Sequence, residues 1–232
     1  MLYINSYKAK FIKSLGILII SLTGLSACSS GPKKIASEVL VNAANKTLTI
    51  LKNREDLDKF NSQLKKAAGV AIFPSVYKAG FFAGAEAGNG ILISRNSNGI
   101  WGYPAFYTLA SGSWGLQFGG QKSGIIFIIR NSGAVEALMQ HQGKLSAGMN
   151  VAAGNLGTGL EGGITTNLGA DIIAYSDSKG LFTGVSLKGS AMVRRNDLNS
   201  EYYGKEVDPQ SIIIQHALQN PQADGLRRTL NQ

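Results

Sequence analysis

Glycine is concentrated in the middle of this chain, and that concentration restricts the fold more than any other feature. Residues 69–169 contain 21 of the 29 glycines. Because glycine loses the most backbone entropy on folding, such a segment is a poor helix former. Short runs rich in β-branched and aromatic residues lie between the glycines, at 70–73, 79–85, 90–94, 106–110, 115–118 and 124–129. They predict strands, and the small residues within them predict a tightly curled sheet in which neighbouring backbones approach closely.

Residues 34–68 have a helical pattern instead. Between 34 and 53, Ile35, Val39, Ala43, Lys46 and Ile50 recur at helical spacing, with no glycine or proline. This stripe predicts an amphipathic helix.

A second amphipathic helix is predicted over 55–68. Leu57, Phe60 and Leu64 form its apolar stripe. Acidic residues occupy its first turn and lysines its last, as the helix dipole favours, and Gly69 ends it.

The C-terminal third mixes both kinds of pattern. We expect a short helix over 134–144, strands within 163–174 and 181–194, and a final helix over 210–219 that starts after Asp208-Pro209. Strands predominate in the middle and helices lie at the ends. The predicted fold class is therefore α+β: a glycine-rich, mainly antiparallel curled sheet with N-terminal amphipathic helices and a C-terminal helix.

The first residues have the composition of a secretory signal. Three lysines precede an apolar run at 15–22, which is too short to span a membrane as a stable helix. The run is followed by Leu25-Ser26-Ala27-Cys28, which resembles the bacterial lipobox, and Cys28 is the only cysteine. We therefore expect a signal peptide at 1–27, a lipidated tether at 28–33 and a single domain at 34–232. Ser29 follows Cys28, which resembles the sorting signal for the outer membrane, facing the periplasm.

The net charge of the chain and its predicted secretion together limit the kinds of molecule that it is expected to bind. Removal of residues 1–27 would lower the formal charge from +9 to about +6. This modest basic excess suits an anionic membrane surface, and secretion together with scattered basic residues argues against nucleic acid.

Motifs for catalysis are scarce. The chain has two histidines, His141 and His216, and contains neither H-E-x-x-H nor G-x-S-x-G. Residues 157–162 match G-x-G-x-x-G, but a β-branched continuation replaces the helix that a dinucleotide site needs. Glu86 could pair with Glu161 or Asp171, although sequence separation does not show proximity. We expect no enzyme activity, no catalytic residues, no metal and no cofactor.

Several blocks in order resemble the SYLF domain, a lipid-binding module of bacterial lipoproteins and of eukaryotic membrane-trafficking and actin-patch (YSC-type) proteins. They include Ala68-Gly-Val-Ala-Ile-Phe-Pro74, Gly99-Ile-Trp-Gly-Tyr-Pro-Ala105, the stretch from Tyr175 to Leu187, and Asn199-Ser-Glu-Tyr-Tyr-Gly204. The resemblance spans about residues 35–220. It implies a non-catalytic domain that binds phosphoinositides or other anionic lipids through an N-terminal basic amphipathic helix. A secreted bacterial lipoprotein meets neither host actin nor abundant phosphoinositide, so neither ligand is carried over.

The leading hypothesis is an envelope lipoprotein, anchored through Cys28, whose domain binds anionic phospholipid. The candidate headgroup ligands are Arg54, Lys59, Lys65, Lys66 and Lys78. Each cation near an anionic bilayer contributes about 1 kcal/mol. The alternative for these lysines is an ordinary solvated helix face. The alternative function is a structural or interaction protein that docks another envelope component.

Overall fold

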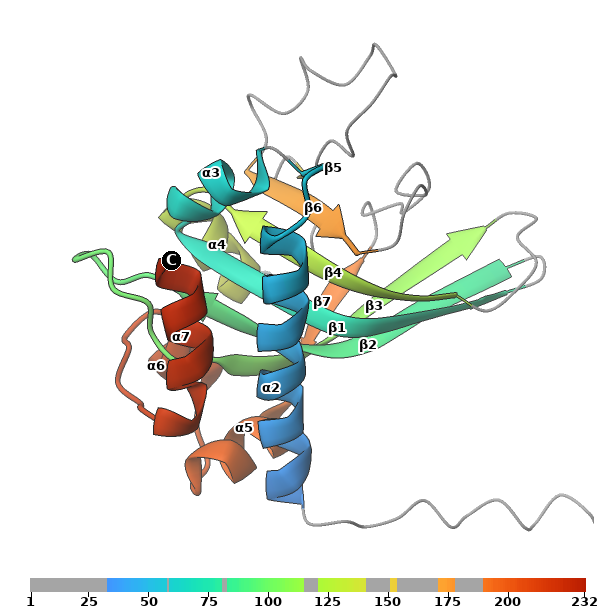
Figure 1. The fold of residues 1–232 in the computed structure, drawn as a ribbon. Helices are drawn as coiled ribbons and strands as arrows, with labels where there is room; N and C mark the ends of the chain where they lie inside the picture. Colours follow the sequence, from blue (N-terminus) through green and yellow to red (C-terminus); the bar gives the residue numbers. More distant parts are fainter. Residues whose placement is uncertain are drawn as a thin grey trace, which may run out of the picture. The chain divides into compact units, whose positions relative to one another are not determined.

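The computed structural model describes residues 33–57, 59–80, 83–114, 121–140, 151–153, 171–177 and 190–232. Within them a sheet lies between two layers of helices, which confirms the α+β class (Figure 1). The elements are α2 (Lys33–Lys52), α3 (Phe60–Lys65), β1 (Gly69–Gly80), β2 (Ala83–Ser94), β3 (Ala105–Trp114), β4 (Gln121–Ile129), α4 (Ser132–Gln140), β5 (Val151–Ala153), β6 (Ile172–Ser176), β7 (Ala191–Arg194), α5 (Asn196–Tyr203), α6 (Pro209–Ile213), η1 (Pro221–Ala223) and α7 (Asp224–Asn231). The predicted signal peptide and Cys28 lie outside the described residues.

The strands form one sheet in the order β5-β6-β4-β1-β2-β3-β7. Neighbouring strands are antiparallel except for the parallel pair β5 and β6, so the prediction of a mainly antiparallel sheet is confirmed. Over the described residues β5 and β7 are the two edges, and the sheet is not closed. Strands β1 to β4 form its long centre (Figure 1).

The close approach of neighbouring backbones that the glycines predicted occurs where β1 pairs with β2. The register of β1 shifts between Ile72 and Tyr77, around Pro74. A proline lacks the N–H that a central strand must donate, so it is found at such irregularities. A Cβ atom added to Gly88 would lie 2.3 Å from the carbonyl oxygen of Ser75, and one added to Gly90 would lie 2.3 Å from that of Ile72. Only glycine fits at these two positions.

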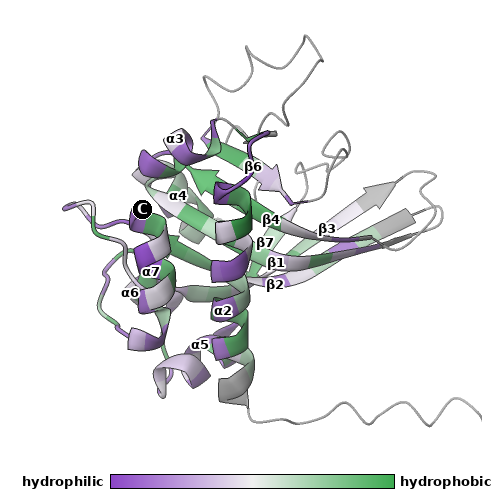
Figure 2. Ribbon diagram, in the orientation of Figure 1, coloured by the Kyte–Doolittle hydropathy of each residue, from purple (hydrophilic) through white to green (hydrophobic). Residues whose placement is uncertain are grey.

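Alternate residues of the strands pack into two separate hydrophobic cores, one on each face of the sheet. Val70 and Ile72 pack into the cluster beneath α2, α3, α5 and α7, whereas Ala71 and Phe73 face α4 and α6. Because successive side chains of a strand point to opposite faces, a segment buried on both sides is apolar throughout, as residues 70–73 of β1 and 125–129 of β4 are. Figure 2 shows the same pattern: the sheet is hydrophobic where the helices cover it and more hydrophilic where β1 and β2 extend beyond them.

Helix α2 confirms the predicted element, but the predicted stripe is its outward face. Val39 is 58% exposed and Ile50 is 44% exposed. The buried positions are Val41, Ala44, Leu48 and Leu51. Together with the short polar side chains of Ser37 and Thr47, which are also buried, this second stripe faces the core, and it contains no lysine.

The helix predicted over 55–68 is wrong in length. Residues 54–57 form turns, and α3 begins only at Phe60. The side chain of Arg54 binds Asp56, which keeps this segment in a local turn, although Phe60 and Leu64 are buried as predicted.

The predictions for the remaining segments had mixed outcomes. The strand predicted at 79–85 is instead the end of β1 and the start of β2. Helix α4 confirms the helix predicted from 134, and its predicted part at 141–144 lies outside the described residues, as do 115–118, 163–170 and 181–189. Asp208 caps α6 as expected, but the helix ends at Ile213, before His216 takes a positive φ of 51°.

Candidate functional site

Three of the five predicted headgroup ligands lie on or beside α3 and face solvent. Lys59 precedes the helix, and Lys65 and Lys66 end it; all three are exposed. Buried Phe60 and Leu64 set this orientation, and the Phe60 ring packs edge-on against Tyr175 with its centroid 4.9 Å away. The helix therefore presents its basic side outward, and Figure 2 shows it as predominantly hydrophilic.

Arg54 is close to α3 in the chain, but its charge is compensated. Its Nε donates to Asp56 Oδ1 at 2.8 Å, a second nitrogen binds the other carboxylate oxygen, and Nη1 donates to the Ser176 carbonyl at 3.0 Å. The hydrogen bond with Asp56 raises the pKa of Arg54 above its ordinary value. Arg54 thus stabilises the turn before α3, and its guanidinium is not free for a headgroup.

Lys78 is separated from the other four. It lies nine residues beyond the start of β1, roughly 30 Å along the strand at the ordinary rise per residue. Its ammonium is 3.0 Å from the carboxylate of Glu86, which is only 6% exposed. Removal of Lys78 would leave a buried charge unpaired, so its first role is in the hairpin.

Lys52 is a basic residue beside α3 that the sequence interpretation missed. It ends α2, and its ammonium donates to the Thr229 carbonyl in α7 at 2.7 Å. Burial, and then the positive charge of Lys65, lower the pKa of Lys52. Lys52 and Lys65 therefore lie near enough for their positive charges to repel each other. An anion bound between them would reduce this repulsion. A basic residue in the last turn of a helix was the signal that could have identified it.

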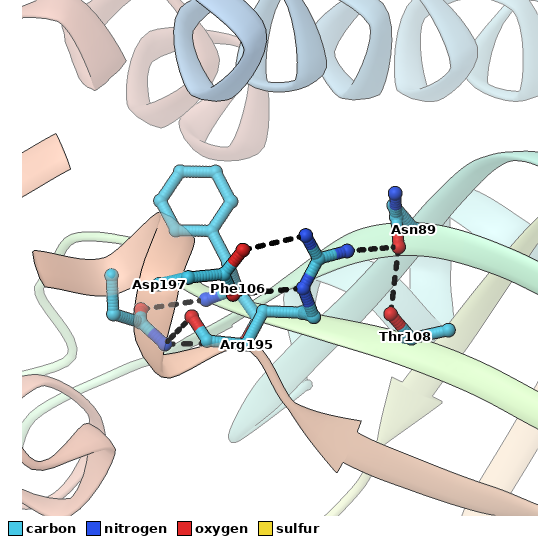
Figure 3. Close-up of polar contacts among 6 residues, drawn as sticks. Asn89, Phe106, Thr108, Arg195 and Asp197 are labelled. Carbon is cyan, nitrogen blue, oxygen red and sulfur yellow. Dashed lines mark hydrogen bonds and ion pairs between the residues drawn. The ribbon is translucent and has the colours of Figure 1, made fainter. Parts of the chain in front are cut away.

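A polar network joins α5 to the sheet, and the side chain of Arg195 lies at its centre (Figure 3). Arg195 binds both carboxylate oxygens of Asp197, and its Nη1 donates to Asn89 Oδ1 at 2.9 Å. Thr108 donates to the same oxygen at 2.6 Å. The hydrogen bond from Arg195 lowers the pKa of Asp197. These contacts are satisfied internally, so we assign them to the fold.

The carboxylates proposed as an acid/base pair have separate partners. Glu86 pairs with Lys78, and Asp171 accepts a hydrogen bond from Asn131; Glu161 lies outside the described residues. Among the residues that the structure describes, no three His, Cys, Asp or Glu side chains gather as a metal site would need. Within the same residues no helix has the length and apolar character needed to cross a membrane.

Comparison with known proteins decides the family. Residues 110–232, just over half of the chain, match the Ysc84 family, described as "Las17-binding protein actin regulator". The chain is 35% identical over 170 residues to SH3 domain-containing YSC84-like protein 1 of Rattus norvegicus, which covers 72% of this chain and 49% of the relative. The chain belongs to the Ysc84 family. This confirms the resemblance to SYLF and YSC-type domains.

Two yeast members of the Ysc84 family are similar to the same extent. LAS seventeen-binding protein 3 of Saccharomyces cerevisiae is 34% identical over 171 residues, covering 72% of this chain and 37% of that protein. Protein YSC84 of the same organism is 35% identical over 171 residues, with 36% of its length covered. The chain spans about half the length of the mammalian relatives and less of the yeast ones. These relatives are named for binding and regulation, not for enzyme activities. The family match starts at residue 110, so the lysines of α3 lie outside it.

Proposed function

We propose that this Ysc84-family chain is a non-catalytic envelope lipoprotein, anchored through lipid on Cys28, that binds anionic phospholipid through Lys59, Lys65 and Lys66. The observation that carries the proposal is the orientation of α3, whose buried Phe60 and Leu64 leave these lysines exposed and without an ion pair to any residue that the structure describes. Arg54 and Lys78 support the surrounding structure and are not part of the proposed site. We propose the periplasmic side of the outer membrane as its location.

The outward face of α2 supplies apolar surface beside this basic group. Val39 and Ile50 are exposed on it, with Lys46 between them. Lysines beside apolar side chains suit an interfacial helix, because cations meet headgroups while apolar groups enter the acyl boundary. This face is therefore the proposed second element of the membrane contact.

Vesicle binding of the soluble fragment 29–232 tests the proposal. We expect binding to vesicles that contain phosphatidylglycerol, weakening as salt rises, and little binding to phosphatidylcholine alone. Lys→Glu at positions 59, 65 and 66 together should weaken binding about a hundredfold, given about 1 kcal/mol per cation. Lys65→Glu with Lys66→Glu should weaken it far more than Lys122→Glu with Lys205→Glu, a matched pair at exposed sites elsewhere. Equal binding to neutral and anionic vesicles would contradict the proposal.

A second candidate is an interaction protein of the envelope. It is favoured by the names of the relatives, which describe binding to another protein. Recovery of one stoichiometric envelope partner by the fragment, without vesicle binding, would favour this candidate over the first.

A further inference from the structure

The sheet face that carries α2 continues beyond this helix, and none of the described elements covers it there (Figure 1). Ile91 and Phe106 lie on this face in the core beneath α2. Further along the same face the side chains reach solvent, and Tyr77 is 58% exposed and Val193 51% exposed. We call this part the uncovered sheet face. By strand register it consists of Tyr77, Ala85, Ala87, Asn89, Thr108, Ala110, Gly112, Lys122 and Val193.

Small apolar side chains make this surface unusual for a solvated sheet. An antiparallel sheet with one face in water ordinarily places polar side chains on that face. Here Ala85 and Ala87 are exposed and Ala110 is half-buried, while the charged pair of the same strands, Lys78 and Glu86, points to the other face. Alanine is a poor strand former, so the stability of the strands does not explain these residues. They leave a flat surface that another element can approach closely.

The exposed apolar side of α2 faces away from its neighbouring helix α7. Lys52 marks the side of α2 that contacts α7, because its ammonium donates to a carbonyl of that helix. At about 100° per residue, Val39, Ala43 and Ile50 lie on the opposite side. Val39 and Ile50 are exposed, and Ala43 is half-buried. Figure 1 shows α5 and α7 on one side of α2 and the uncovered strands on the other.

This side of α2 borders the uncovered sheet face directly. Thr47 lies over Gly124, where an added Cβ atom would be 2.9 Å from the Thr47 methyl carbon. Lys122, a member of the uncovered sheet face, is two residues from Gly124 in β4. Because a helix is about 10 Å thick, α2 and the sheet form a step that is one helix deep. A second helix lying along α2 would contact both the apolar side of α2 and the sheet.

We propose that the helix in this position is α2 of a second copy of the chain. In an antiparallel pair, Val39 of one copy meets Ile50 of the other. Ala43 then meets Lys46, since both pairs are centred on the same point of the helix. The small Ala43 leaves room for the Lys46 stem, whose ammonium stays in water. Each α2 also lies on the sheet of the other copy, so the contact is identical from both sides and closes as a two-fold dimer.

This dimer would regulate the membrane contact, a consequence that rests on the proposed function. Val39 and Ile50 pack against the second copy and cannot enter a bilayer at the same time. The uncovered sheet face spans five strands, β4 to β7 in the sheet order, or about 19 Å. Interfaces of this small size dissociate readily. The monomer is therefore the form that engages the bilayer, and the dimer is the form that does not.

Sedimentation equilibrium of the fragment 29–232 tests for the dimer. Residues 33–232 form one compact unit, and the fragment retains all of them. We expect a reversible monomer–dimer equilibrium. Ile50→Glu and Ala87→Arg should each weaken it about tenfold or more, because each buries an unpaired charge in the contact. Ile100→Glu, at an isoleucine that is exposed elsewhere, should leave it unchanged. A fragment that stays monomeric at about 1 mM, or equal effects of Ile50→Glu and Ile100→Glu, would overturn the proposal.

Cysteine pairing tests the antiparallel arrangement of the two helices. The fragment has no native cysteine, because Cys28 is the only one in the chain. We expect a disulfide-linked dimer when the Val39→Cys and Ile50→Cys proteins are mixed and oxidised, but not from either protein alone. The two copies of position 39 would lie about 16 Å apart along antiparallel helices, beyond the reach of a disulfide. Equal cross-linking in the mixture and in either protein alone would contradict this arrangement.

The disulfide-linked dimer also separates this inference from the proposed function. On vesicles that contain phosphatidylglycerol, we expect it to bind about tenfold more weakly than the same protein after reduction, since the apolar part of the membrane contact is covered. Equal binding before and after reduction would refute the regulation. If neither the reduced protein nor the unmodified fragment binds these vesicles, the proposed function fails while the dimer stands.

Discussion

Single polar side chains complete the backbone hydrogen bonding of this fold. Asn199 of α5 is fully buried, and its Oδ1 accepts from the Phe106 N–H at 2.8 Å. Its Nδ2 donates to the carbonyls of Phe106 and Arg195. The amide is thus the partner of the Phe106 N–H, and it adds a second hydrogen bond to the carbonyls of Phe106 and Arg195, which also accept from the backbone N–H groups of Arg195 and Asn199. Apolar residues can fill the same volume, but they cannot make these bonds.

Asn199→Ala should therefore be strongly destabilising. It leaves the buried Phe106 N–H without a partner, and we expect a loss of about 2–3 kcal/mol in the free energy of unfolding. Urea denaturation monitored by circular dichroism measures the change. Asn61→Ala is the matched control, because Asn61 is exposed on α3 and donates only to the Lys52 carbonyl; its cost should stay below about 1 kcal/mol. Equal losses in the two variants would refute the role given to Asn199.

At the scale of elements, local patterns predicted the type of structure more reliably than its orientation or length. In α2 the spacing correctly predicted a helix, but the helix has two apolar stripes, one that includes Val39 and one that includes Leu48. Only packing against the sheet determines that the stripe with Leu48 is the buried one. The predicted helix over 55–68 ignored the local bond between Arg54 and Asp56. Such side-chain contacts compete with the helix and have no hydrophobic period to reveal them.

The candidate sites could be predicted only in part, for the same reason. The lysines of α3 were identified from their place beside an apolar stripe, and they are exposed. Arg54 and Lys78 were grouped with them because the partners Asp56 and Glu86 are not evident as partners from charge alone. A pocket between α4 and α6 is lined by residues as far apart in sequence as Ala68 and His216, and no local pattern shows that such residues share a cavity.

The docking of α7 gives a pH-dependent prediction at this scale. Arg227 donates to Asp224 at 2.7 Å and to the Trp101 carbonyl at 3.0 Å, and the Tyr103 hydroxyl also donates to Asp224. The hydrogen bond from Arg227, followed by that from Tyr103, holds the pKa of Asp224 below its ordinary value. A carboxylate with a lowered folded pKa stabilises the fold above its unfolded pKa of about 3.9, and this contribution disappears as the pH falls through the folded value.

Asp224→Asn should thus lower stability near neutral pH and cease to matter in acid. The measurement is the free energy of urea unfolding of the two proteins from pH 7 down to the most acidic pH at which both fold. The difference should be modest, because the side chain is partly exposed. Glu55→Gln, at an exposed position before α3, should produce no such pH-dependent difference. A difference that persists unchanged into acid would show that Asp224 acts through packing and not through its charge.

At the scale of the whole molecule, the sheet separates two surfaces with different chemistry. One face is covered by α2, α3, α5 and α7 and includes the exposed lysines of α3. The other is covered by α4 and α6, which form the walls of the pocket. The predicted lipid site, Cys28, lies five residues before Lys33, the first residue of α2. A chain of five residues spans at most about 18 Å, so lipid on Cys28 would keep the start of α2 near the bilayer that holds it.

The length of this tether should determine how often α3 meets the membrane that anchors it. We expect that inserting about twenty Gly and Ser residues between Gly31 and Pro32 lowers the effective concentration of α3 at the bilayer about tenfold, since it falls roughly as the −3/2 power of linker length. Ser62→Cys, exposed on α3, offers a labelling site for an environment-sensitive fluorophore, because lipidation occupies the only native cysteine in the proposed protein.

The fluorophore separates the effect of the tether from the effect of lipid charge. On anionic vesicles the native tether should give blue-shifted emission, and the long tether should give a smaller shift that recovers as the anionic lipid fraction rises. A label at Ser97→Cys, in the connection between β2 and β3, should respond to neither change. Emission at position 62 that ignores both tether length and lipid charge would mean that the anchor, and not α3, accounts for all contact with the membrane. In that case the exposed lysines would be an ordinary solvated face.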